Sequence, residues 1–77
     1  MIPKTADVLV HLDEQLDRRG QDDLDATLRG LKGVFSVRIP TNKPHLVLVA
    51  YNPDWTSSRA ILVSVTHKGL HAELVGL

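Results

Sequence analysis

Three side chains with metal-ligand chemistry lie on two segments of the chain that have the pattern of strands. His11 lies near the end of residues 7–12, and His71 and Glu73 lie in residues 70–75. Both segments alternate apolar and polar residues, which is the period of a strand. If the two strands are antiparallel neighbours, all three side chains share one face of a sheet. Two imidazoles and a carboxylate are a candidate site for Zn(II), Ni(II) or Cu(II), and the alternative is a set of surface or interface residues.

A second group is acidic and follows the first of these segments. It comprises Asp13, Glu14, Asp17, Asp22 and Asp23. Carboxylates suit Mg²⁺ or Ca²⁺, but their spacing does not match the ligand run of an EF-hand. A solvated loop followed by acidic residues in the first turn of a helix explains the cluster better.

Enzyme signatures are absent from the sequence. It contains no P-loop, no G-x-G-x-x-G, no nucleophile elbow and no H-E-x-x-H. No pair of a nucleophile and a base can be defended from the residues. We therefore expect that the chain is not an enzyme.

Composition limits the function classes further. The 77 residues predict a single domain, 1–77, with 43% hydrophobic residues and no cysteine, so disulfides are excluded and a reducing compartment fits. Nine basic residues balance nine acidic ones, which gives no basic field for nucleic acid or for a membrane surface. The longest apolar run, Leu46–Tyr51, is far shorter than the roughly 20 residues of a membrane helix. The first residues lack the apolar stretch of a signal peptide, so a cytoplasmic location is expected.

Two segments have the spacing of amphipathic helices. In residues 17–32, leucines at spacings of four and three form one stripe, with Asp17 or Gln21 as the start and Gly33 as the end. A second helix is expected to begin at Thr56 or Ser57, with Ile61 and Val65 on its inner side and with Lys68 and Gly69 at its end. Strands are expected at residues 7–12, 34–39, 45–51 and 70–75.

The order of these elements is strand, helix, strand, strand, helix, strand. Two right-handed crossovers in this order predict an α+β, ferredoxin-like βαββαβ fold. Its four-stranded antiparallel sheet carries both helices on one face. The other face of the sheet is then left uncovered.

The uncovered face combines apolar and charged positions. By strand alternation it carries Leu9, Leu46, Leu48, Ala50 and Val75 beside His11, Arg38, His71 and Glu73. Apolar side chains gathered on an exposed sheet often mark an interface, and the alternative is a modest patch broken by charges. The possible interface comprises Leu9, Arg38, Leu46, Leu48 and Val75.

Four further aromatic or imidazole residues receive weaker assignments. Trp55 is either an exposed binding anchor or a side chain that packs over the start of the second helix, and packing is favoured. Phe35 is the only aromatic near the open face, whereas an RNA-binding sheet needs several, so nucleic acid is not expected. His45 is expected at a turn or an edge, and His67 at the end of the second helix.

Three blocks of the sequence resemble heavy-metal-associated domains, the copper-chaperone type. They are Leu31-x-Gly33-Val34, then Val49-Ala50-Tyr51-Asn52-Pro53, then Ile61, Val65, Gly69 and Ala72 in a helix and a last strand. The blocks occur in the order and at the spacing of that family, and the resemblance spans about residues 7 to 75.

The resemblance implies a metal site that this chain departs from. The family binds Cu(I), Zn(II) or similar ions through Cys-x-x-Cys between the first strand and the first helix. Counting back from Gly33 places those two positions at Asp17 and Gly20, and a methionine that precedes them becomes Gln15. Soft ions need sulfur ligands, and the only methionine of the chain is Met1. The resemblance therefore carries over the fold and a docking surface, without the thiolate chemistry.

Two functions remain open at this stage. In the first, the chain is a non-enzymatic interaction or regulatory module that docks a protein partner or a second copy of itself, through the open face or the loop before the first helix. In the second, it is a metal carrier that uses His11, His71 and Glu73 instead of cysteine.

Overall fold

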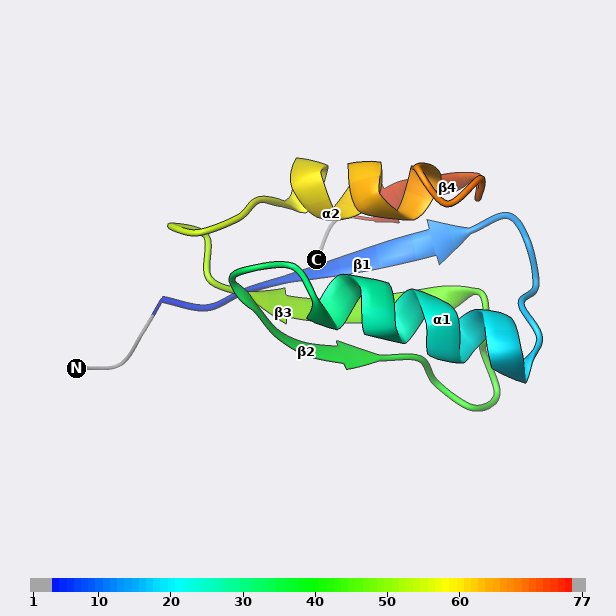
Figure 1. The fold of residues 1–77 in the computed structure, drawn as a ribbon. Coiled ribbons are helices and arrows are strands. Elements are labelled where there is room, and N and C mark those ends of the chain that lie inside the picture. The colour runs from blue at the N-terminus through cyan, green and yellow to red at the C-terminus, as the bar shows by residue number, and fades with distance from the viewer. Residues whose placement is uncertain (1–3, 76–77) are drawn as a thin grey trace.

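A four-stranded antiparallel sheet forms one layer of the structure and two helices form the other (Figure 1). The computed structural model describes residues 4–75. The elements are β1 (Ala6–Leu12), α1 (Arg18–Arg29), β2 (Val34–Arg38), β3 (Leu46–Tyr51), α2 (Ser58–Thr66) and β4 (Ala72–Val75). Their order and the α+β, ferredoxin-like class match the sequence prediction.

The strands lie in the order β2-β3-β1-β4, with every neighbouring pair antiparallel. Each helical crossover therefore passes over one strand, β3 under α1 and β1 under α2. Helix α1 contacts β2, α2 contacts β4, and the two helices contact each other, so both cover the same face. No other helix or strand among residues 4–75 is available to cover the opposite face.

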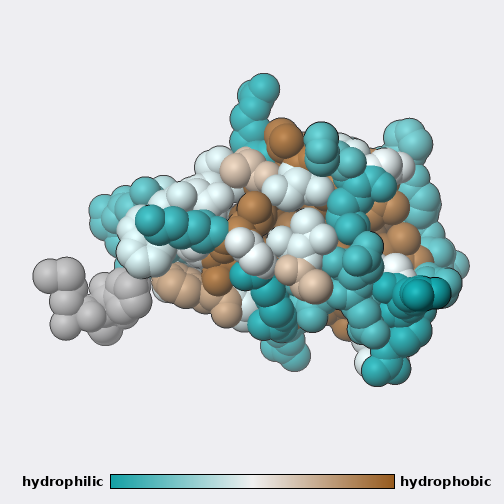
Figure 2. All heavy atoms as spheres, in the orientation of Figure 1, coloured by the Kyte–Doolittle hydropathy of each residue, from teal (hydrophilic) through white to brown (hydrophobic). Residues whose placement is uncertain are grey.

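The core lies between the sheet and the helices. Strands β1 and β3 bury every second residue, and each helix buries two positions. The buried apolar residues are Val8, Val10, Leu12, Leu24, Leu28, Val37, Val47, Val49, Tyr51, Ile61 and Val65. This burial confirms the strand alternation and the inward positions of both helices except Leu31, which lies beyond α1 and is half-buried. In Figure 2, which shows the helix side, hydrophilic side chains extend outward and hydrophobic ones lie between them.

The end of α1 differs from the sequence prediction. The helix ends at Arg29 with Gly30 as its C-cap, so the expectation that it runs to residue 32 and is ended by Gly33 is wrong. Glycine is a poor helix former, and Gly30 supplies that break earlier. Gly33 instead turns the chain into β2 with φ of +96°, a conformation that favours glycine.

Both edge strands are irregular or short. In β2 the register shifts between Val34 and Ser36, which is a bulge at Phe35. Strand β4 begins at Ala72 rather than at residue 70, because the His71 N–H donates to a side-chain carboxylate of another segment instead of to a strand. Within residues 4–75, neither helix has the length and apolar character needed to cross a bilayer.

Candidate functional site

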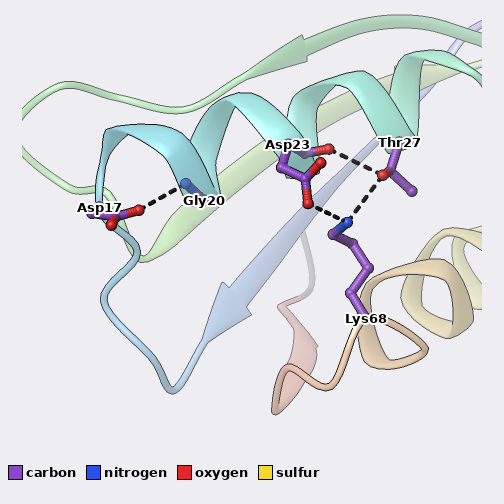
Figure 3. Close-up of polar contacts among 5 residues, drawn as sticks. All are labelled: Asp17, Gly20, Asp23, Thr27 and Lys68. Atoms are coloured by element: carbon purple, nitrogen blue, oxygen red, sulfur yellow. Dashed lines mark hydrogen bonds and ion pairs between the residues drawn. The ribbon is translucent and has the colours of Figure 1, made fainter.

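The loop between β1 and α1 ends in an N-cap. Asp17 has an extended backbone, and its Oδ1 accepts a hydrogen bond of 2.8 Å from the Gly20 N–H (Figure 3). Such a cap satisfies one of the N–H groups that the first turn of a helix leaves without a partner. Asp17 and Gly20, the two positions that the sequence resemblance matches to Cys-x-x-Cys, are therefore hydrogen-bonded to each other.

The packing around Gly20 is close. A β-carbon on Gly20 would lie 3.2 Å from Asp17 Oδ1 and 3.3 Å from the Leu16 β-carbon. Any larger residue at this position would have to displace the cap or the leucine. The local geometry thus suits an Asp and Gly pair that forms a helix start.

The donor set of this loop does not fit a soft metal ion. Cu(I) prefers thiolate or thioether sulfur, and the chain has no cysteine. Its one methionine, Met1, lies outside the described residues. Of the two family positions, only Asp17 has a side chain that could ligate, and that carboxylate is engaged in the cap.

A lysine at the end of α2 joins the two helices. Lys68 Nζ donates to Asp23 Oδ2 at 2.8 Å and to Thr27 Oγ1 at 3.2 Å, both on α1 (Figure 3). The hydrogen bond and charge of Lys68 lower the pKa of the Asp23 carboxyl below its usual value. Hydrogen bonds from Lys68, two residues beyond the end of α2, therefore connect that end of α2 to α1.

The acidic residues of the sequence do not form one cluster. Asp23 pairs with Lys68, Asp22 lies 3.7 Å from Arg18, and Glu14 is engaged elsewhere. Among residues 4–75 no three histidine, aspartate or glutamate side chains are grouped so that they could hold a metal ion. The first turn of α1 contains no acidic residue, so the expectation of acidic residues there is wrong, and Asp22 and Asp23 follow that turn.

Glu14 holds the start of β4 against the loop. Its two carboxylate oxygens accept the His71 backbone N–H at 2.9 and 3.1 Å, and Oε2 lies 2.6 Å from His71 Nδ1. The hydrogen bond to Glu14 raises the pKa of His71, and the same bond lowers the pKa of Glu14. His71, just before β4, is thus bonded to Glu14 in the β1–α1 loop.

The other two predicted ligands lie opposite each other. His11 and Glu73 are Cα partners in the β1–β4 pairing and so share a face of the sheet, as strand alternation predicted, whereas the sequence had placed His71 close to His11. The ring of His11 contacts the ring of His45, with centroids 5.2 Å apart and planes inclined by 71°. The structure therefore places the His11 ring beside that of His45, with Glu73 as its cross-strand Cα partner, while His71 is engaged by Glu14. Metal binding by the set His11, His71 and Glu73 stays a prediction.

Strand alternation alone does not predict that His45 lies beside His11. Leu12 N donates to His45 O at 2.7 Å, which continues the β1–β3 register by one residue beyond β3. That register depends on the length of the turn before β3, which strand alternation alone does not specify.

The predicted interface residues form a row across the open face. In register, Arg38 lies opposite Leu48, Leu48 opposite Leu9, and Leu9 opposite Val75. This row, named here the open-face row, crosses all four strands, and Leu46 lies in the next row opposite His11. Val75 is 39% exposed and Arg38 is exposed, while the three leucines are half-buried. A role of this row as an interface stays a prediction.

Trp55 corrects one sequence expectation. Its side chain is 61% exposed, so the expectation that it packs over the start of α2 is wrong. The Lys32 ammonium lies 5.6 Å from the centroid of the Trp55 ring, a cation–π contact. The base of Trp55 lies against Gly33, where an added β-carbon would be only 2.8 Å from the Trp55 β-carbon.

Comparison with known proteins identifies the fold. No protein-family model matches the chain, and no curated protein matches it in sequence. Solved structures do match over nearly the whole length. A copper-binding domain from HMA7, a P-type ATPase, has a TM-score of 0.82 at 17% identity, covering 91% of this chain and 93% of that one.

Two further solved structures are similar to this chain to about the same degree. Oxidized MerP from Ralstonia metallidurans has a TM-score of 0.83 at 12% identity, with coverage of 95% of this chain and 100% of that one. The CsoZ metallochaperone has a TM-score of 0.79 at 14% identity, with coverage of 91% and 99%. The chain therefore has the ferredoxin-like fold of heavy-metal-associated domains, and the resemblance noted in the sequence is confirmed at the level of the fold.

Proposed function

We propose that this chain is a small, non-enzymatic domain of the heavy-metal-associated type that has lost the thiolate metal site and serves as a protein-interaction or regulatory module. The observation that carries the proposal is the hydrogen bond between Asp17 and Gly20. The positions that would hold the ion are used as a helix cap instead. A scaffold like those of metal-binding domains is kept, and its donor atoms are not.

The surface proposed for docking is the open-face row with Leu46. An apolar strip across β3, β1 and β4, with Arg38 on β2 at one end, gives a partner both buried area and a charge to recognise. The occupant is a protein partner or a second copy of the chain. Nine acidic residues against nine basic ones do not favour nucleic acid or a membrane surface, and the proposed location is the cytoplasm.

The loss of the thiolate site is tested by Cu(I) competition. The wild-type chain and the double variant Asp17→Cys/Gly20→Cys are titrated with Cu(I) against a chromogenic Cu(I) chelator under reducing conditions. We expect the wild type to leave Cu(I) with the chelator and the double variant to withdraw it, because two thiolates restore the soft-ligand pair. Asp17→Ser/Gly20→Ala is the matched control, since it alters the same loop without sulfur.

Tight retention of Cu(I) by the wild type would contradict the proposal. Failure of a folded double variant to bind Cu(I) would contradict the assignment of positions 17 and 20. Folding of each variant is checked by circular dichroism before the titration.

Docking between copies is tested separately by sedimentation over a range of concentrations. If the open-face row is a self-association surface, the wild type forms a dimer that Leu48→Glu dissociates, because a buried carboxylate without a partner is costly. Val63→Glu is the matched control, since Val63 is 54% exposed on α2. A dimer that persists in Leu48→Glu, or that Val63→Glu disrupts instead, rules out this surface.

A further inference from the structure

The Nδ1 atom of His11, on β1, has no hydrogen-bond partner among the described residues. His11 Nδ1 is shielded from solvent, and no hydrogen-bond donor or acceptor of the described residues reaches it. Buried polar atoms nearly always have a partner, because an unsatisfied one costs free energy. His11 lies on β1, one of the two central strands, so its backbone position is fixed by neighbours on both sides. This nitrogen therefore calls for an explanation.

The nearest imidazole is that of His45. The two ring centroids are 5.2 Å apart. A zinc–nitrogen bond of about 2.0 Å puts the metal roughly 3.2 Å from each ring centroid, and a tetrahedral angle between two such bonds separates the centroids by about 5 Å. The spacing of His11 and His45 is thus compatible with a shared metal ion, and it is also the spacing of edge-to-face ring packing.

The backbone holds both histidines in place. Leu12, the neighbour of His11, donates to the His45 carbonyl at 2.7 Å, and the residue after His45 donates to the Lys43 carbonyl at 3.1 Å. The terminal torsion of a histidine side chain is broad, so each ring can turn toward an ion without movement of the main chain.

We propose that His11, through Nδ1, and His45 form a two-imidazole site for a divalent transition metal ion such as Zn(II) or Cu(II). The site lies where β1 meets the start of β3, away from the Asp17 and Gly20 cap. Imidazole nitrogen suits these ions, and the described part of the chain offers no third ligand in the same group. Glu73, the cross-strand partner of His11, adds negative charge nearby. The proposal does not depend on partner docking or on the fate of the thiolate site.

The experiment titrates the full chain with ZnCl₂ against a chromogenic zinc chelator. The variant His45→Phe keeps an aromatic ring beside His11 and removes both nitrogens, so it separates ligation from ring packing. Losing the partner of a metal ligand typically weakens binding 10–100-fold, so losing a ligand should weaken it at least roughly tenfold. We expect this loss in His45→Phe and in His11→Gln. The variants His71→Gln and His67→Gln are matched controls and should bind Zn(II) as the wild type does.

NMR of the imidazole nitrogens provides a second readout. Zn(II) should shift the Nδ1 resonance of His11 and a ring nitrogen of His45, with the His71 signals unchanged. If His11→Gln does not fold, the folded His45→Phe variant decides the question.

Three outcomes would overturn the proposal. One is a wild-type chain that takes up no Zn(II) or Cu(II) at millimolar metal. Another is equal affinity in the wild type and His45→Phe. The last is a loss of affinity in His71→Gln as large as that in His45→Phe, which would return the site to the set read from the sequence.

Discussion

Removal of the Asp17 side chain measures how much the loop between β1 and α1 now contributes to folding. Asp17→Ala deletes the acceptor of the 2.8 Å bond from the Gly20 N–H and leaves that N–H to water. Loss of an N-cap of this kind costs about 1 kcal/mol of unfolding free energy, within a range of roughly 0.5–2 kcal/mol. For a domain of this size, each kcal/mol lowers the unfolding midpoint by about 4–8 °C.

The assay is urea and thermal unfolding followed by far-ultraviolet circular dichroism. Asp17→Asn and Asp17→Ser keep a side-chain oxygen that can cap, and they should retain most of the stability. Asp22→Ala is the matched control on the same helix, because Asp22 is exposed and lies 3.7 Å from Arg18. Exposed pairs contribute little, so this change should stay within about 0.5 kcal/mol of the wild type.

Two results would refute the reasoning about the cap. Equal losses in Asp17→Ala and Asp17→Asn would show that the oxygen is not what stabilises the helix start. A loss in Asp17→Ala no larger than that in Asp22→Ala would show that the bond contributes nothing measurable. In either case the argument that position 17 has exchanged ligation for capping would lose its energetic support.

Three further perturbations test other contacts. Gly33→Ala should lower the free energy of unfolding, measured in urea, by at least about 1 kcal/mol more than Gly69→Ala does. Both glycines have positive φ, but of the two only Gly33 has other atoms within 4 Å of an added β-carbon. Equal losses in the two variants would refute this. In the folded protein the pKa of His71 is raised from 6.5 and the pKa of Glu14 is lowered from 4.5. His71→Gln should therefore lose most stability between pH 4.5 and pH 6.5, where both partners are charged. The loss should shrink as the pH rises through the folded pKa of His71, and also as the pH falls through the folded pKa of Glu14. A pH-independent difference in unfolding midpoint, or an NMR titration of His71 with an inflection below 6.5, would contradict the pair. Lys68→Met should lower the unfolding midpoint by removing the link between the helices, and the difference from wild type should narrow at high salt; a difference that salt does not alter would point to packing instead.

The sequence specified the fold because its periodic patterns do not conflict. Leucines spaced for one helical stripe and valines spaced for one sheet face leave few ways to bury both sets. The buried positions Leu24, Leu28, Val10 and Val49 follow directly from those patterns. Right-handed crossovers that each pass over one strand then predict an antiparallel sheet with β1 beside β4, and the structure has that pairing.

The details that were missed depend on contacts between distant segments. The late start of β4 follows from competition for the His71 N–H, which periodicity does not report, whereas the early end of α1 follows from Gly30, a local feature of the sequence. The contact between Glu14 and His71 spans 57 residues, and that between His11 and His45 depends on strand register. Trp55 was expected to pack over the start of α2. Because Gly33 has no side chain, the Trp55 β-carbon lies close to the Gly33 backbone, and Trp55 stays exposed.

The edges of the sheet constrain how another chain could approach. A long, regular edge strand offers free N–H and C=O groups that recruit foreign strands and seed aggregation. Here one edge, β4, has four residues within the described part of the chain, and the other, β2, has a bulge and a carbonyl at Val37 that accepts a hydrogen bond from Arg29 of α1. Main-chain addition of a strand is disfavoured at both borders. If the open face is the docking surface proposed above, recognition there is governed by side-chain shape, and a change of one residue can alter the choice of partner without disturbing the backbone.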